Sequence, residues 1–283
     1  MRPAPADARD EKARAVRVHG WRRLASALWS EPNDPQIYGS LSIDASNLLA
    51  FIQRAQEAGH HLTPTHLVGR ATARALTAVP DLNVRLVGDQ AVPRDGVDIF
   101  FIAALAAAGG DLSGVKLARV EERDVFSVAR ELDGRSARLR RGDDPALSRA
   151  KSALDRLPRP VLRLVLRLGA WATGERAWSL RLLGLEASPF GSAMVSSVGM
   201  LGLPSGFAPI AWLYRVPVLV LVGEIEEQPR AVLGRVEVRP VLPLSFSVDH
   251  RYVDGAQLGR AATTIREYLA DPAAFEPAPD SAK

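Results

Sequence analysis

The chain has no cysteine among its 283 residues. Disulfide bonds, thiolate metal ligands and a cysteine nucleophile are therefore excluded from its chemistry. It also lacks the roughly 20 consecutive apolar residues that a membrane-spanning helix needs. Its longest apolar run, residues 216–222, is short and rich in β-branched residues. We interpret that run as a buried strand.

A strong excess of one charge is also missing. The chain has 36 basic and 32 acidic residues, a net charge of +4 and a pI of about 9.7. This mild balance does not predict a nucleic-acid partner and suits an enzyme for an anionic ligand. With 47% hydrophobic and 24% charged residues, the composition is typical of a globular protein with a large core. The polar first twenty residues show no secretory signal, and we expect a cytoplasmic protein.

The most informative stretch is residues 244–260, LSFSVDHRYVDGAQLGR. Apolar and hydroxyl residues alternate up to Asp249, which predicts a half-buried strand that ends there. His250 and Asp254 follow at the transition to a loop, where rigid scaffolds commonly display catalytic groups. We expect Gly255 to supply a tight backbone conformation that other residues resist. A lone histidine at a strand end is commonly structural, but this combination indicates a catalytic base.

The segment DHRYVDGA resembles the DHRxxDGA signature that ends the catalytic domain of the 2-oxoacid dehydrogenase acyltransferases, the E2 components. That domain is similar in fold to chloramphenicol acetyltransferase, and both share an HxxxDG core. As in the family, the signature lies near the C-terminus and leads into a helix, which closes here at YLADP. The resemblance implies an α/β (α+β) coenzyme A-dependent acyltransferase fold, with a mixed sheet flanked by helices.

The N-terminal part supports this resemblance. We expect a flexible arm over residues 1–17, a catalytic domain over residues 18–275 and a disordered tail over residues 276–283. The helix pattern WRRLASALW carries Arg22 and Arg23 where the family has a basic pair. In the wider fold an early arginine pairs with the aspartate of the HxxxDG core, which gives these two residues a supporting role. A solvated arginine face is the alternative interpretation.

Residues 62–86 are similar to the family pattern LTxxxFxxKAxxxALxxxPxxN. Thr63 or Thr65 is expected to cap a helix, on which His66 has a packing or capping role. No metal is predicted, because His60 and His61 have no spaced partners. The list of core positions on this helix is Leu67, Ala71, Ala75 and Leu76.

The next segments depart from the family. Residues 97–107 predict a buried strand, but AAAGGDLSGVKL then replaces the GLxxPVI segment that lines the family's substrate channel. This leaves the acyl specificity open. Residues 153–187, rich in leucine, arginine and tryptophan, are a helical insertion where the family has a shorter link. We favour a hairpin packed on the domain or against another subunit, with a cap over a substrate entrance or a helix on a membrane surface as alternatives.

The segment AMVSSVG is similar to the family motif FTISNLG, which places Ser196 on the motif's hydroxyl position and Ser197 beside it. A hydroxyl in such a loop is commonly a cap. Together with the histidine motif, it implies that Ser196 donates to an oxyanion. The resemblance therefore implies catalytic roles for His250 as general base, Ser196 as oxyanion donor and Asp254 as organiser, with Gly255 in support.

The resemblance implies an acyltransferase that moves an acyl group between coenzyme A and a thiol such as dihydrolipoamide. Coenzyme A is a substrate, a lipoyl group would come only from a partner protein, and the family forms trimers with sites between subunits. The chain shows no lipoyl-domain pattern, so we expect a catalytic domain standing alone. We expect neither a nucleic-acid nor a membrane partner. The alternatives are a non-catalytic scaffold related to E2, and an acyltransferase that acts on an amine or hydroxyl acceptor.

Overall fold

The computed structural model describes residues 35–104, 112–141, 158–179, 186–211 and 213–281. The chain divides into Met1–Pro35 and Gln36–Lys283, and the account below concerns the second unit. The predicted helix at residues 21–29, with Arg22 and Arg23, lies outside the described residues.

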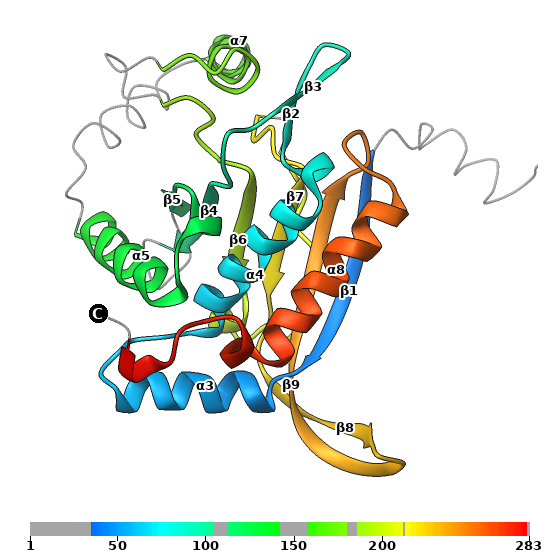
Figure 1. Cartoon of the computed structure of the whole chain (residues 1–283). Coiled ribbons are helices and arrows are strands. Elements are labelled where there is room, and N and C mark those ends of the chain that lie inside the picture. Colours follow the sequence, from blue (N-terminus) through cyan, green and yellow to red (C-terminus); the bar gives the residue numbers. More distant parts are fainter. Residues whose placement is uncertain (1–34, 105–111, 142–157, 180–185, 212, 282–283) are drawn as a thin grey trace, which may run out of the picture. The chain divides into compact units, whose positions relative to one another are not determined.

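The main sheet has seven strands in the order β1-β9-β7-β6-β4-β5, and β8 pairs with β9 (Figure 1). β4, β6 and β7 are parallel, whereas β1, β5 and β8 each pair antiparallel with a neighbour, as β9 does with β7. The sheet is therefore mixed, as the sequence predicts. The strands are β1 (Gln36–Asp44), β4 (Ile99–Ala104), β5 (Leu112–Leu117), β6 (Ala193–Ser197), β7 (Val218–Val222), β8 (Glu226–Val232) and β9 (Arg235–Asp249). A separate hairpin consists of β2 (Val84–Val87) and β3 (Gln90–Pro93).

Helices pack on one face of this sheet. α4 and α8 lie side by side across the strands, with α5 and α3 beside them (Figure 1). These helices are amphipathic, and the aliphatic side chains that they bury contribute the main core together with the same face of the sheet. The helices are α3 (Ser46–Glu57), α4 (Pro64–Ala78), α5 (Val125–Arg140) and α8 (Gly255–Ala270). The four core positions predicted on α4 are all buried.

The start of α4 follows the predicted capping chemistry. Thr63 is the N-cap, and its backbone N–H donates to Nδ1 of His66 at 3.2 Å, which completes a capping box. His66 is only 3% exposed. The capping role predicted for His66 is confirmed.

β9 is the strand that leads to His250. It lies between β1 and β7 and ends at Asp249, as predicted. Leu244 and Val248 face the helices, but Ser245 and Ser247 on the other face are also buried, at 3% and 1% exposure. The prediction of a half-buried strand is therefore wrong, because β9 has a strand on either side and packing on both faces.

The face of the sheet opposite the helices is covered by loop segments. A second core cluster there contains Met194, Val216, Leu219 and Leu221. Phe190 and Tyr214 pack over it, with ring centroids 4.7 Å apart.

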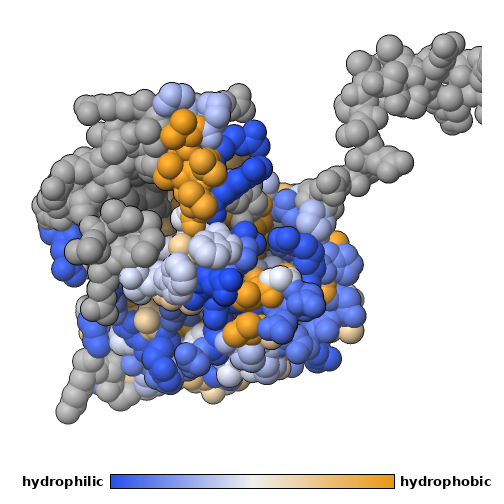
Figure 2. Space-filling model, turned by 90° about the horizontal axis from the view of Figure 1, so that it is seen from above, coloured by the Kyte–Doolittle hydropathy of each residue, from blue (hydrophilic) through white to orange (hydrophobic). Residues whose placement is uncertain are grey.

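The predicted insertion contains α7 (Arg159–Ala170), followed by a π-helical turn, Trp171–Glu175. The turn is held to the rest of the unit by Arg85, whose Nη1 donates to the Glu175 carbonyl oxygen at 2.7 Å. Arg215 also pairs with the Glu175 carboxylate at 2.7 Å. Apolar side chains of α7 form an orange band on the surface, with hydrophilic side chains beside it (Figure 2).

The C-terminal residues pack on the core. Glu276 is 7% exposed, and its carboxylate accepts hydrogen bonds from the Tyr268 hydroxyl at 2.8 Å and the Val125 amide at 2.7 Å. Its Oε1 also lies 3.1 Å from Nε of Arg70. Burial raises the pKa of Glu276, although the Val125 amide and Arg70 oppose this shift. The disordered tail predicted from residue 276 is therefore wrong for residues 276–281, which the C-terminal acid ties to α4, α5 and α8.

Within the described part of the chain, no helix is both long and apolar enough to cross a membrane.

Candidate functional site

His250 stands directly after β9, with its imidazole held by the loop that follows. Nδ1 lies 2.6 Å from the carbonyl oxygen of Val253. A carbonyl can only accept a hydrogen bond, so Nδ1 must carry the proton in this contact. The neutral imidazole is thus held in one tautomer, with the lone pair on Nε2. This is the tautomer that a general base at Nε2 needs.

The residues on either side of His250 fix the turn. Asp249 is 5% exposed, and its Oδ1 accepts from the backbone N–H and Nε of Arg251 at 3.0 and 2.9 Å. The hydrogen bond to this carboxylate raises the pKa of Arg251. The Asp249 backbone N–H also donates to the Pro217 carbonyl at 2.9 Å. Sequence reasoning missed this pair, although Asp249 and Arg251 flank the histidine in the DHR motif.

Asp254 caps α8. Its Oδ1 accepts from the Ala256 backbone N–H at 2.8 Å and from that of Gln257 at 3.5 Å. Gln257 returns a contact, because its Oε1 accepts from the Asp254 backbone N–H at 3.1 Å. The side chain therefore fixes the junction between the His250 loop and α8. Among the described residues it forms no ion pair, and its predicted arginine partners lie outside them.

The special backbone conformation predicted for Gly255 is wrong. Gly255 is the first residue of α8, it is not among the described residues with positive φ, and a Cβ added there would meet no atom within 4 Å. The conformation of the loop is set by the Asp254 cap and the Val253 carbonyl contact instead.

Ser196 lies on β6, beside Ile102 of β4 and Leu221 of β7 in the sheet register. Leu221 belongs to the core cluster on the face away from the helices, so Ser196 shares that face. Ser197 points to the other face, because successive side chains of a strand alternate. The two adjacent hydroxyls thus serve opposite sides of the sheet.

One chain does not bring Ser196 and His250 together. Ser196 is level with Leu221, and Leu221 is level with Ser245 on β9. His250 comes five residues after Ser245. At roughly 3.3 Å per residue, the two positions are separated by about 16 Å along the strand direction, with two strand spacings between them.

A cavity of about 560 Å³ lies on the helix side of the sheet, at the carboxyl ends of the parallel strands β4, β6 and β7. Ser197 lines it, with the acid Asp133 between two histidines. Asp133 Oδ2 is 2.6 Å from Nδ1 of His61, and its Oδ1 is 3.5 Å from Nε2 of His66. Partial burial opposes the charged form, but the hydrogen bonds from the two histidines outweigh it and lower the pKa of Asp133. Neither Ser196 nor His250 lines this cavity.

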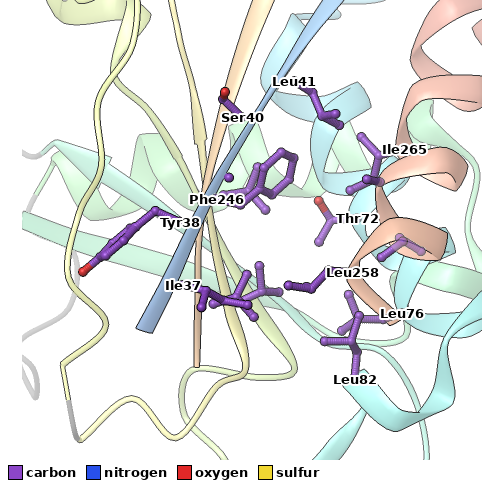
Figure 3. Close-up of a pocket in the computed structure, with 17 residues that line it drawn as sticks. Ile37, Tyr38, Ser40, Leu41, Thr72, Leu76, Leu82, Phe246, Leu258 and Ile265 are labelled. Carbon is purple, nitrogen blue, oxygen red and sulfur yellow. The ribbon is translucent and has the colours of Figure 1, made fainter. Parts of the chain in front are cut away.

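A smaller cavity of about 140 Å³ lies between β1 and the helices α4 and α8. Its walls are almost entirely apolar. Leu76, Leu258 and Ile265 point into it, whereas Tyr38 points away across the strand (Figure 3). It contains none of the predicted site residues. The hydroxyl of Thr72 in its wall donates to the Val68 carbonyl at 2.8 Å.

In the described ranges, no group of three or more His, Asp or Glu side chains has an arrangement that could hold a metal ion. The predicted site residues are instead those of acid–base and hydrogen-bond chemistry: an imidazole with a defined tautomer, a hydroxyl on a strand and an acid that orders a loop.

Solved structures support the predicted fold. The chain matches a probable dihydrolipoamide acetyltransferase from Listeria monocytogenes with a TM-score of 0.62 and 20% identity, over 92% of this chain and 96% of that chain. It matches the cubic core of a pyruvate dehydrogenase multienzyme complex with a TM-score of 0.62 and 22% identity, over 97% of this chain and 99% of that chain. The predicted acyltransferase fold is confirmed.

Curated relatives match over shorter stretches. The dihydrolipoyllysine-residue acetyltransferase component of the Acholeplasma laidlawii pyruvate dehydrogenase complex is 27% identical over 132 residues, 44% of this chain and 24% of the relative. The mitochondrial dihydrolipoyllysine-residue succinyltransferase component from Saccharomyces cerevisiae is 26% identical over 206 residues, 73% of this chain and 35% of the relative. The chain thus spans about a third or less of the length of these relatives.

The family model described as 2-oxoacid dehydrogenases acyltransferase (catalytic domain) matches residues 7–143 and 181–276. The gap between the two matched stretches contains α7, which agrees with the predicted insertion. Both matched stretches together cover most of the chain, including the His250 loop and Ser196. The predicted family and its enzyme class are thereby confirmed, and the chain belongs to the 2-oxoacid dehydrogenase acyltransferases through their catalytic domain.

Proposed function

We propose that this chain transfers an acyl group between coenzyme A and a thiol such as dihydrolipoamide, with His250 as the general base. The observation that carries the proposal is the 2.6 Å contact between His250 Nδ1 and the Val253 carbonyl. It leaves Nε2 as the basic nitrogen of the neutral ring.

The acyl transfer needs one proton to move twice. Nε2 of His250 takes the proton of the acceptor thiol as its sulfur attacks the thioester carbonyl carbon. The new carbon–sulfur bond produces a tetrahedral oxyanion. When the intermediate collapses, the bond to the coenzyme A sulfur breaks and the imidazolium returns the proton to that sulfur. No acyl-enzyme forms, and no metal or redox cofactor takes part.

The Ser196 hydroxyl is proposed to donate to the oxyanion, a contact worth on the order of 3 kcal/mol in the transition state. The sheet register separates Ser196 from His250 within one chain. We therefore assign the two residues of each site to neighbouring copies, in a homotrimer or a higher multiple. The similarity to the cubic core of a multienzyme complex agrees with such an assembly.

The supporting residues act on the position of the imidazole. Asp254 fixes the start of α8 and thereby the loop that carries the Val253 carbonyl. Asp249 anchors the other side of His250 through Arg251. We retain Arg22 and Arg23 as proposed partners of Asp254, and Gly255 as a neighbour without a special backbone role.

The proposed partner follows from the relatives' names. The matched relatives are named for a dihydrolipoyllysine residue, so a lipoylated protein is the proposed partner of this chain. The cytoplasm is the proposed location. Acyl-CoA is the proposed donor.

The test is acetyl transfer from acetyl-CoA to dihydrolipoamide, with the wild type compared with His250→Ala and Ser196→Ala. We expect His250→Ala to lower the rate by roughly 10²- to 10⁴-fold with an unchanged melting temperature. Ser197→Ala is the matched control for Ser196→Ala, because its hydroxyl lies on the opposite face of the sheet. Equal rates for His250→Ala and wild type would refute the assignment.

If the wild type does not acetylate dihydrolipoamide but binds coenzyme A, the same assay with amine and hydroxyl acceptors distinguishes a changed acceptor. If it neither transfers nor binds, the scaffold alternative replaces the proposed activity.

A further inference from the structure

α7 exposes an apolar stripe along one side. The stripe consists of Val161, Leu164, Val165, Leu168 and Trp171, whose spacing of three and four residues places them on one face of the helix. Their exposed fractions are 44%, 56%, 41%, 57% and 38%. Large apolar side chains that face solvent over about three helical turns mark an interaction surface rather than ordinary surface variation.

Basic side chains lie along one edge of this α7 stripe, where Arg167 is three residues after Leu164 and four before Trp171. Helix α7 has three arginines and no acidic residue, and Arg163 and Arg167 are both exposed. Arg176 extends the basic border past the helix, with its guanidinium 5.2 Å from the centre of the Trp171 ring. Trp178 packs edge-on against Trp171, with ring centroids 5.6 Å apart, and is itself 52% exposed.

The stripe is presented on a fixed base. The π-helical turn after α7 is tied to β2 by Arg85 and to the loop before β7 by Arg215, both through Glu175. Since these contacts use the turn and not the stripe, they leave the stripe residues available. The arrangement is therefore one anchored helix whose outward face is apolar with a basic border.

We propose that the α7 stripe rests in the headgroup region of an anionic lipid bilayer. An amphipathic helix with Leu, Val and Trp on one face and arginines beside them is the pattern that lies in the plane of a membrane interface. Arginines at the border pair with lipid phosphates, and tryptophan rings occupy the boundary between headgroups and acyl chains. The helix lies on the bilayer and does not cross it.

Charge decides between a bilayer and a second copy of the chain. Two antiparallel α7 helices packed stripe to stripe would bring their arginine edges together, and α7 contains no acidic residue to pair with them. An anionic bilayer supplies a counter-charge for each arginine. The sequence alone favoured packing on the domain or a subunit contact, but the exposed fractions show that the described residues of this chain do not cover the stripe.

This proposal is independent of the acyl-transfer chemistry, because no stripe residue belongs to the proposed site. It concerns where the protein acts.

The test measures binding of the full chain to lipid vesicles by flotation. One set of vesicles is phosphatidylcholine alone, and the other contains about one third phosphatidylglycerol, which is anionic. We expect binding to the anionic vesicles, which Leu164→Glu/Leu168→Glu should reduce at least tenfold. Leu233→Glu/Val236→Glu is the matched control, since these two apolar residues are 101% and 78% exposed in the β8–β9 hairpin. This control should bind as the wild type does.

A second pair of variants tests the basic border. Arg163→Gln/Arg167→Gln should weaken binding to the anionic vesicles by roughly thirtyfold, at about 1 kcal/mol for each cation. Arg235→Gln/Arg266→Gln removes the same charge from exposed positions elsewhere. This control should weaken binding to the anionic vesicles much less.

Because the chain has no cysteine, a single one can be labelled without background. A polarity-sensitive fluorophore on Leu168→Cys should shift to the blue when anionic vesicles are added, whereas the same label on Leu233→Cys should not. The proposal is overturned if the wild type binds neither vesicle, or if the stripe and hairpin variants bind equally. The wild type could instead self-associate in the absence of lipid, with only the stripe variant losing this self-association. That result would assign the stripe to a contact with a second copy and would also overturn the proposal.

Discussion

The His250 loop and α7 are built in opposite ways. The loop lies between a central strand and a helix that is fixed at both ends, at Asp254 by its cap and at Tyr268 by the buried Glu276. α7 is attached mainly through the turn that follows it, and its largest side chains face outward. The His250 loop fixes the position of one imidazole nitrogen, whereas α7 exposes an apolar surface.

The difference shows how each kind of task uses burial. A general base must be held in one position and one tautomer, which requires hydrogen bonds and packing from several elements. A docking helix needs only a fixed orientation, since its apolar side chains become buried when the partner binds. If this contrast is right, changes in the network beneath α8 will cost folding free energy, whereas changes on the α7 stripe will not.

The largest effect is expected for Glu276→Gln. The glutamine has one acceptor oxygen where the carboxylate has two, so it cannot accept from both Tyr268 and Val125. The Arg70 charge, which is 9% exposed at its side chain, also loses its ionic partner. Leaving one buried charge unpaired costs about 3–5 kcal/mol of the free energy of unfolding. Urea denaturation measures it, with Glu267→Gln, which changes an exposed acid on α8, as control. A loss below about 1 kcal/mol would show that solvent reaches Arg70 and that α8 is less firmly anchored than described.

A smaller effect is expected for Asp254→Ala, which removes the N-cap of α8. The free energy of unfolding should fall by about 1 kcal/mol. Asp254→Asn keeps an acceptor at the cap and should restore most of that stability. The acyl-transfer rate of the two variants then separates the roles of Asp254. If the asparagine variant is stable but slow, the charge itself is needed, as the proposed pairing with Arg22 or Arg23 requires.

The smallest effect on stability is expected for Leu164→Glu/Leu168→Glu. Both side chains are more than half exposed, so the free energy of unfolding should change by less than about 0.5 kcal/mol for each substitution. The same denaturation experiment measures it. A loss of several kcal/mol would mean that the stripe packs on this chain, and the contrast between the two regions would fail.

Much of the fold could be predicted from local patterns. The alternation before Asp249, the capping role of His66 and the core face of α4 depend on residues a few positions apart. The buried state of Ser245 and Ser247 could not be predicted in this way, because it depends on which strands lie beside β9. The ordered C-terminus was missed for the same reason, since Glu276 is fixed not only by Tyr268 on the preceding helix but also by Arg70 and Val125, which are far away in the chain.

The candidate site divides along the same line. The motif was sufficient to find His250, and the period of a strand predicts that Ser196 and Ser197 face opposite ways. The tautomer of His250 required the position of the Val253 carbonyl, which no spacing encodes. For Gly255 the motif led to a wrong prediction. The glycine was expected to adopt a special backbone conformation, but it lies in a helix where other residues would fit.

The order of strands also has a consequence for synthesis. β1 pairs along its whole length with β9, from Gln36 with Asp249 to Asp44 with Val241. The first strand of the described chain therefore emerges from the ribosome long before its partner, and the sheet closes only after β9 has been made. Contacts between such distant segments are slow to form, and they expose strand edges in the meantime. The residue proposed to begin catalysis, His250, thus follows the strand whose arrival completes the fold.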